Sequence, residues 1–154
     1  MKRVIALLLV VVLSALVFCG CEYKLTTDLY SVMAEINEKY EYDNMNILQS
    51  VDELNEFYLI EKEDVVSFAA EFSTGNSYTT EIVLVEAVDE KSAQDVSSVL
   101  NNYYQTRVDM AQTYDDYYAH ILSSCSVVVK GRYVSLIISD KASEIEELYN
   151  SYFE

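Results

Sequence analysis

His120 is the only histidine in the chain, so most catalytic or metal-binding chemistry would have to be arranged around it. A Ser-His-Asp triad or a histidine-based zinc site would need it at the centre. Cys125, five residues later, offers the thiol of a thiol–base pair. Hydroxyls and carboxylates also stand nearby, as they would in any chain this acidic: Ser123, Ser124, Asp115 and Asp116. The pattern favours a histidine on the surface or at a helix end and a cysteine buried as a small apolar residue. We therefore expect no enzyme activity and no catalytic residue.

Sites for phosphate or metal ions are not indicated either. The only glycines are Gly20, Gly75 and Gly131, so no glycine-rich loop is available to cradle a phosphate. The spacing of an EF-hand is also missing. Asp115 and Asp116 could bind Ca²⁺ weakly, as could the group Glu86, Asp89 and Glu90, but a solvated run of charge is the simpler interpretation. We expect no cofactor and no metal site.

Tyrosine is the unusual feature of the composition, with 14 residues against no tryptophan. Five of them gather in one stretch of the chain: Tyr103, Tyr104, Tyr114, Tyr117 and Tyr118. A tyrosine ring offers a large contact area with a polar tip, which suits the margin of a core as well as a surface that binds sugar or peptide. On a helix Tyr104 is turned by about 100° from Tyr103, and residues 114–118 have no clear period. We therefore expect several of these rings to be exposed, and both interpretations stay open.

The N-terminus has the pattern of a lipoprotein signal peptide. Lys2 and Arg3 precede the uncharged, mostly apolar residues 4–18, and polar residues follow directly after Cys19-Gly20-Cys21. A basic start, an apolar stretch of roughly 7–15 residues and a small residue before the cleavage point define a secretory signal. The stretch is short for a membrane span, which needs about 20 apolar residues. Gly20 places the small residue directly before Cys21, which favours Cys21 as the lipidated residue. The alternatives are lipidation of Cys19, or a plain signal peptide or uncleaved anchor.

These boundaries divide the chain into a signal peptide (1–20), a short lipid tether (21–26) and a single acidic domain (27–154). Cleavage after Gly20 of the 154-residue chain would leave 134 residues, enough for one domain. The expected location is the extracytoplasmic face of the cell membrane, where a diacylglycerol lipid on Cys21 anchors the protein. The tether is so short that the domain and its tyrosine cluster should lie close to the membrane.

The charge of the mature chain is strongly negative. All 26 Asp and Glu residues follow position 21, together with only 8 of the 10 Lys and Arg residues, so the formal charge without the signal peptide is −18. Nucleic-acid binding depends on basic contacts to phosphate, and anionic lipid headgroups also attract basic surfaces. The composition argues against both kinds of partner, and it fits a solvated exterior or a basic partner.

Hydrophobic periodicity and turn residues predict an α+β domain with the element order ααββαββα. A capping box begins the second helix at Ser50-x-x-Glu53, and Ser92-x-x-Asp95 indicates a similar start for the third. Gly131 is expected at positive φ in a tight turn between the last two strands. A hairpin followed by a helix occurs twice, which predicts an antiparallel four-stranded sheet with helices packed mainly on one face. The expected helices cover 27–40, 50–58, 89–112 and the residues after 140, and the expected strands cover 66–72, 81–88, 126–130 and 132–139.

Most of the mature chain resembles a known family. The resemblance is carried by Glu81-Ile-Val-Leu-Val-Glu-Ala, a charged helix, and then Val-Val-Val-Lys130-Gly131-Arg-Tyr133-Val-Ser-Leu-Ile-Ile-Ser139-Asp. These segments are similar to small lipoproteins of low-GC Gram-positive bacteria that are catalogued as domain of unknown function 4358. The resemblance covers roughly residues 27–153, and it implies a lipoprotein of a monoderm host with the fold above. Its motif consists of a turn, a strand and a helix cap, so it implies no catalytic or ligand residue.

Two classes of function remain. One is a non-catalytic binding or accessory module at the cell surface, whose partner would be an exported protein, a peptide or a wall glycan. The other is a hydrolase or another enzyme acting on cell-wall or exported substrates, which converging carboxylates in a pocket would favour. Because the sequence has no clear nucleophile, base or metal signature, we favour the binding module, with its surface at the five tyrosines.

Overall fold

The structure, a computed structural model, describes residues 23–42, 44–74 and 79–154. The predicted signal peptide and the predicted lipidation site Cys21 lie outside the described residues. The elements in chain order are α2 (Leu29–Tyr40), β1 (Met45–Ile47), α3 (Val51–Tyr58), the short 3₁₀ helix η2 (Lys62–Asp64), β2 (Val65–Ser73), β3 (Glu81–Ala87), α4 (Glu90–Tyr114), α5 (Asp116–Leu122), β4 (Val127–Lys130), β5 (Tyr133–Ile138) and α6 (Ala142–Asn150).

The strands form one antiparallel sheet in the order β1-β2-β3-β5-β4. All four predicted strands are present, as β2 to β5, but the predicted total of four is wrong. The fifth strand, β1, lies at the edge and pairs residues 45–47 with residues 71–73 of β2. It was missed because three residues are too few for the alternation of about 4–8 residues by which a strand is recognised.

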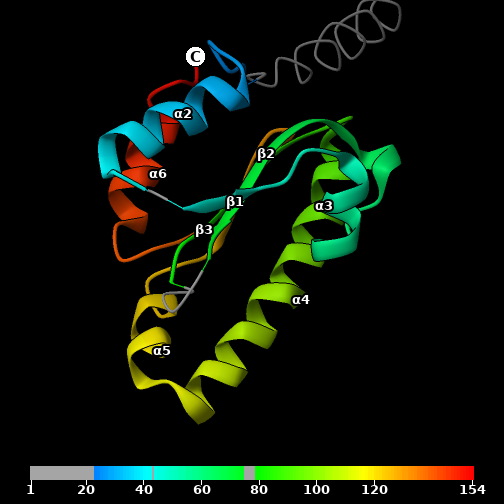
Figure 1. Cartoon of the computed structure of the whole chain (residues 1–154). Helices are drawn as coiled ribbons and strands as arrows, with labels where there is room; N and C mark the ends of the chain where they lie inside the picture. The colour runs from blue at the N-terminus through cyan, green and yellow to red at the C-terminus, as the bar shows by residue number, and fades with distance from the viewer. Residues whose placement is uncertain (1–22, 43, 75–78) are drawn as a thin grey trace, which may run out of the picture.

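Helices cover both faces of the sheet, so the prediction that they pack mainly on one face is wrong (Figure 1). The neighbouring residues Glu81 and Ile82 of β3 must point to opposite faces. Glu81 accepts hydrogen bonds from side chains of α3 and α4. Ile82 pairs with Glu71 of β2, whose carboxylate is bound by α2. Helices α3 and α4 therefore lie on one face, and α2 lies with α6 on the other. This arrangement explains why β3 and β5 are apolar and buried along almost their whole length.

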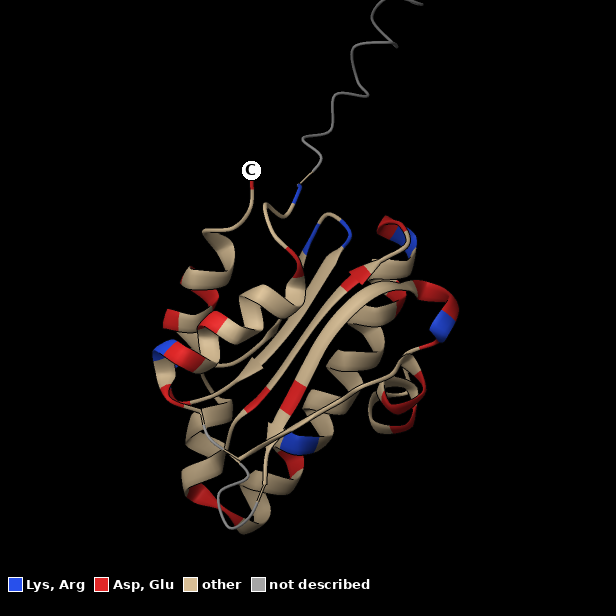
Figure 2. Ribbon diagram, turned by 45° about the horizontal axis from the view of Figure 1, so that its top comes forward, with Lys and Arg blue, Asp and Glu red and all other residues tan. Residues whose placement is uncertain are grey.

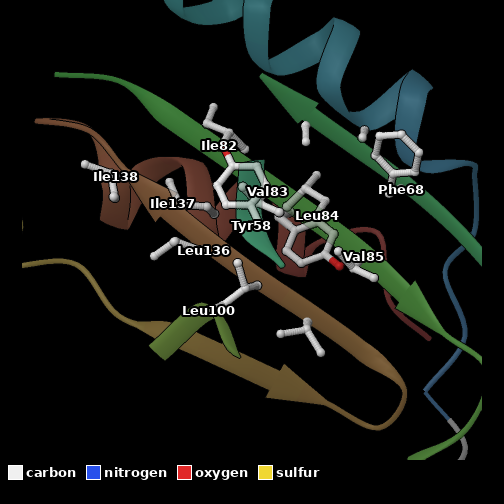
Figure 3. Packing of buried hydrophobic residues seen from close by; sticks show 14 of the residues in the cluster. Tyr58, Phe68, Ile82, Val83, Leu84, Val85, Leu100, Leu136, Ile137 and Ile138 are labelled. Carbon is white, nitrogen blue, oxygen red and sulfur yellow. The ribbon is translucent and has the colours of Figure 1, made fainter. Parts of the chain in front are cut away.

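The core is built from the strands and from one stripe of each helix. Figure 3 shows Tyr58 of α3 and Leu100 of α4 among the strand side chains of β3 and β5, including Val83 and Leu136. Leu100, Val83 and Leu136 have no exposed surface. Fully burying a side chain of this kind contributes about 1.5–3 kcal/mol. Helix α4 covers the sheet with the face that carries Ala93, Val96 and Leu100, which are all buried.

The helix starts follow from local side-chain capping. Ser50 accepts a hydrogen bond from the Glu53 amide, which confirms the predicted start of α3. Helix α4 begins after Asp89, whose carboxylate accepts from the Ser92 amide at 2.8 Å. The prediction of a capping box that starts at Ser92 is therefore wrong. The Ser92 hydroxyl instead donates to Asp64 of η2, which ties the start of α4 to the beginning of β2.

The predicted element order ααββαββα also lacks helix α5, which lies between α4 and β4. Asp115 ends α4 and at the same time caps α5, because its carboxylate accepts from the Tyr118 amide at 2.9 Å. The new helix has only seven residues, fewer than the window in which a helical period is visible. Of the helices in the described residues, none is both long and apolar enough to cross a membrane.

The N-terminal residues that were expected to form the tether lie against the C-terminus. Leu25 forms a β-bridge with Phe153, and the Thr26 amide donates to the carbonyl of Tyr152. The amide of Glu154 donates to the carbonyl of Lys24. The chain thus enters the fold at Tyr23 and Lys24, beside the turn between β4 and β5, where the Lys130 ammonium lies over the Tyr23 ring.

Gly131→Val is expected to lower the free energy of unfolding by more than about 1 kcal/mol. Gly131 has φ +59°, as predicted, and a Cβ added there would lie 3.4 Å from Cδ2 of Tyr23. A β-branched residue is disfavoured in this left-handed region, whereas Asn tolerates it. Urea unfolding of Gly131→Val beside Gly131→Asn would measure the difference, and equal stability of the two variants would contradict the conformational explanation.

Glu71→Gln is expected to stabilise the protein at pH 7 by about 1 kcal/mol, because it removes a buried charge that is poorly compensated. Glu71 has no exposed surface. One of its carboxylate oxygens accepts a hydrogen bond from the side-chain amide of Asn37 at 2.9 Å, whereas the other has no hydrogen-bond partner in the described residues. Burial raises the pKa of this carboxyl, and the hydrogen bond from Asn37 opposes the rise.

The sign of the pH dependence follows from this raised pKa. Above the unfolded-state pKa the unfolded chain loses its proton while folded Glu71 keeps it, so stability falls as the pH rises towards the folded-state pKa. Unfolding measured from pH 4 to pH 8 should show this fall in the parent chain and a weaker one in Glu71→Gln. Glu38→Gln, at an exposed position of α2, is the matched control, and an equally steep fall in Glu71→Gln would contradict the assignment.

Candidate functional site

The groups around the only histidine do not form a catalytic arrangement. His120 is exposed on α5, and the hydroxyl of Ser123 donates to the backbone carbonyl of His120. The Ser124 hydroxyl likewise donates to the carbonyl of Ile121. Cys125 is a free thiol buried among apolar side chains, as predicted, and burial raises its pKa. A buried thiol and an exposed imidazole do not make a thiol–base pair.

The structure divides the five predicted tyrosines into two groups. Tyr103, Tyr104 and Tyr118 are half-buried and pack against the core. Tyr114 and Tyr117, at the junction of α4 and α5, are 85% and 65% exposed. Tyr114 is the most exposed large apolar side chain in the described residues. The prediction that several rings are exposed therefore holds for two of them. The other three rings are held against the core.

Tyr104 fastens α5 to α4. Its hydroxyl lies 2.6 Å from the carbonyl oxygen of Leu122 and 2.9 Å from that of Cys125, so it can donate to either at the end of α5. Burial raises the pKa of this hydroxyl, so it stays a donor at neutral pH. Since Asp115 caps α5 at its other end, both ends of the short helix are fixed.

A buried carboxylate holds the middle of α4 against the sheet. One oxygen of Glu81 accepts from the hydroxyls of Tyr58 at 2.7 Å and Tyr103 at 2.6 Å. The other lies 3.4 Å from Nη2 of Arg107, which also donates to the Tyr103 hydroxyl at 2.6 Å. Burial, followed by the charge of Glu81, raises the pKa of both phenols. Burial lowers the pKa of Arg107 and the Glu81 charge raises it, with a net rise, so the guanidinium stays charged.

The sequence interpretation missed this network, although two signals pointed to it. Glu81 is a carboxylate directly before the apolar run Ile82–Val85 of a strand, and Arg107 is the only Lys or Arg between Lys91 and Lys130. Two isolated opposite charges in apolar surroundings are expected to find one another, because a buried charge is costly without a partner. The two residues are 26 positions apart, so patterns among neighbouring residues do not connect them.

A groove of about 240 Å³ opens beside this network, between the last turns of α4 and the start of α5. It is lined by Arg107, Met110, Ala111, Tyr114, Asp115 and Tyr118. Met110 is 57% exposed at its rim. The Tyr118 hydroxyl is buried and has no hydrogen-bond partner among the described residues. We call these six residues together with Tyr117 the α4–α5 corner.

Most charged residues lie on the helices and loops around the sheet, and the strands carry only a few (Figure 2). At the α4–α5 junction the exposed charges beside the groove are the carboxylates of Asp115, which lines it, and of its neighbour Asp116. In the part of the chain that the structure describes, no three His, Cys, Asp or Glu side chains are placed to hold a metal ion. The corner thus combines exposed aromatic rings, a small groove and a negative rim.

Comparison with protein-family models gives a match over most of the chain. A family model described as "Domain of unknown function (DUF4358)" matches residues 38–139, which include every element from β1 to β5 and the whole α4–α5 corner. No curated protein and no solved structure matches the chain.

Proposed function

The chain belongs to the DUF4358 family, and from its own geometry we propose that it is a non-catalytic binding module, lipid-anchored through Cys21 on the extracytoplasmic face of the cell membrane. In this proposal the α4–α5 corner binds another molecule of the cell surface, such as an exported protein, a peptide or a wall glycan. The signal-peptide pattern before Cys21 supports the location, and the exposed rings of the corner support the activity.

The exposure of Tyr114 and Tyr117 is the observation that carries the proposal. Both rings lie at a junction whose two helices are fixed in place by Tyr104, Asp115 and the Glu81 network. Exposed rings on a rigid support offer a large contact area at a small cost in conformational entropy. Exposed apolar side chains that gather beside a groove mark interaction surfaces more often than scattered ones do.

The corner faces away from the end at which the chain enters the fold. Helix α4 begins close to that end, since the amide of Ala87 at the end of β3 donates to the carbonyl of Arg132 in the β4–β5 turn. The helix then runs for 25 residues, or about 37 Å, to the far end of the molecule (Figure 1). With a lipid on Cys21 the entry end would rest on the membrane, so the corner would project away from it. This replaces the expectation that the tyrosine cluster lies close to the membrane.

Photo-crosslinking in intact cells tests the proposal. The full chain would carry p-benzoylphenylalanine in place of Tyr117, and a second chain would carry it in place of Tyr30, which is 54% exposed on α2. We expect discrete crosslinked products from position 117 and none of these products from position 30. Identical product patterns from both positions, or no product from position 117, would contradict a binding surface at the corner.

A further inference from the structure

Helix α4 is longer than the sheet it covers. Strand β3 has 7 residues, or about 24 Å, whereas the 25 residues of α4 span about 37 Å. The last turns of α4 therefore extend past the strands towards α5, as Figure 1 shows. The stripe that covers the sheet continues onto this overhang with the spacing i, i+3, i+4 and i+7, at Arg107, Met110, Ala111 and Tyr114. There the stripe lines the groove instead of the core.

The groove has the size of a side-chain pocket. Its volume of about 240 Å³ is below the roughly 300–1,000 Å³ of sites that enclose a small molecule. Met110 and Tyr114 offer apolar walls, and Ala111 is buried at its base. The buried hydroxyl of Tyr118 can still donate one hydrogen bond. An aliphatic or aromatic side chain would fill this space.

The negative charge around the groove indicates which charge a binding partner should carry. Arg107 is already paired with Glu81, so it does not offset the exposed carboxylates of Asp115 and Asp116. A second copy of this chain, without the predicted signal peptide, would bring its own formal charge of −18 against this rim. Anionic polymers are disfavoured for the same reason. A segment that carries lysine or arginine beside its apolar residues is complementary to the rim.

We propose that the α4–α5 corner binds a basic segment of a partner protein, with an apolar side chain of that segment in the groove and its Lys or Arg residues against Asp115 and Asp116. The inference rests on the proposed binding function and names the chemistry of its partner. Dependence on the carboxylates distinguishes a basic protein segment from a wall glycan, because a glycan would stack on the exposed rings without needing them.

Two synthetic peptides test the inference on the full chain in detergent micelles. One is a 14-residue peptide of Leu and Lys with Leu at helical spacing, and the other has Glu in place of each Lys. Fluorescence anisotropy should show at least about tenfold tighter binding of the Lys peptide. Met110→Ser/Tyr114→Ser should weaken that binding about tenfold. Asp115→Asn/Asp116→Asn, in which Asn can still cap α5, should weaken it about threefold to tenfold, since each exposed charge pair contributes up to about 1 kcal/mol.

Matched control variants test whether the loss of binding is specific to the corner. Tyr30→Ser removes an exposed ring on α2, and Glu38→Gln/Glu147→Gln removes two exposed carboxylates on α2 and α6. Both controls should bind the Lys peptide as the parent chain does. Equal binding of the two peptides, or equal losses in the corner and control variants, would overturn the inference.

The crosslinking experiment separates this inference from the proposed function. Sequencing the partner peptide attached at position 117 should reveal a basic segment with apolar residues. A glycan or an acidic segment at that position would overturn the inference and leave the binding function standing. A lack of any product at that position would overturn the binding function itself.

Discussion

Glu81→Ala is expected to lower the free energy of unfolding by about 3–5 kcal/mol, which is a large part of the 5–15 kcal/mol that holds a typical domain folded. The residue is 3% exposed and accepts hydrogen bonds from Tyr58, Tyr103 and Arg107. Its removal would leave two phenol hydroxyls without their acceptor and a guanidinium without its counter-charge. Leaving such groups unpaired in a buried place costs more than the lost attraction itself.

Urea unfolding monitored by tyrosine fluorescence and circular dichroism would measure this effect. Glu147→Ala, at an exposed position of α6, is the control and should change stability by less than about 0.5 kcal/mol. Arg107→Met in the Glu81→Ala background should cost less than Arg107→Met alone, because the two residues share one network. A loss below about 1 kcal/mol for Glu81→Ala, or additive effects of the two substitutions, would show that the network does not hold α4.

The same network links stability to the proposed binding surface. Arg107 belongs both to the Glu81 network and to the wall of the groove. A variant that weakens the network should therefore loosen the last turns of α4 as well as lower stability. Glu81→Gln, which keeps the shape of the side chain, should weaken binding of the Lys peptide less than Glu81→Ala does.

Cys21→Ala is expected to abolish lipid attachment and to leave the precursor unprocessed. The cleavage enzyme of lipoproteins acts before a cysteine that already carries diacylglycerol, so the substitution removes both steps at once. Metabolic labelling with a clickable fatty acid, together with the mass of the N-terminal peptide, would measure the change. In the parent chain the mature N-terminus should be a diacylglyceryl cysteine followed by Glu22.

Cys19→Ala is the matched control, because it removes the other cysteine of the same tripeptide and leaves Gly20 before Cys21. We expect this variant to be labelled and processed as the parent chain is. Loss of labelling in Cys19→Ala with labelling retained in Cys21→Ala would move the anchor to Cys19. Normal secretion of an unlabelled chain in all three cases would indicate a plain signal peptide.

The sequence by itself determined those features whose cause lies within a few residues. Strands β2 to β5 and helix α4 could be predicted because their apolar side chains recur with the period of each element. Ser50 could be predicted as a helix cap and Gly131 as a turn residue at positive φ. Both depend on the backbone and side chains of immediate neighbours. Cys125 is buried for a similarly local reason, since it stands two residues before the start of the apolar strand β4.

The tertiary structure decided what depends on residues far apart in the chain. The face that each helix covers is set by how the helices pack on the finished sheet, and β1 exists as a strand only because residues 71–73 are there to pair with it. Glu81 and Arg107 meet only when α4 lies on β3. The same packing half-buries Tyr103, Tyr104 and Tyr118 and leaves Tyr114, on the overhang of α4, and Tyr117, on α5, exposed. All five rings have the same chemistry in the sequence, and only the packing of α4 and α5 distinguishes the exposed rings from the half-buried ones.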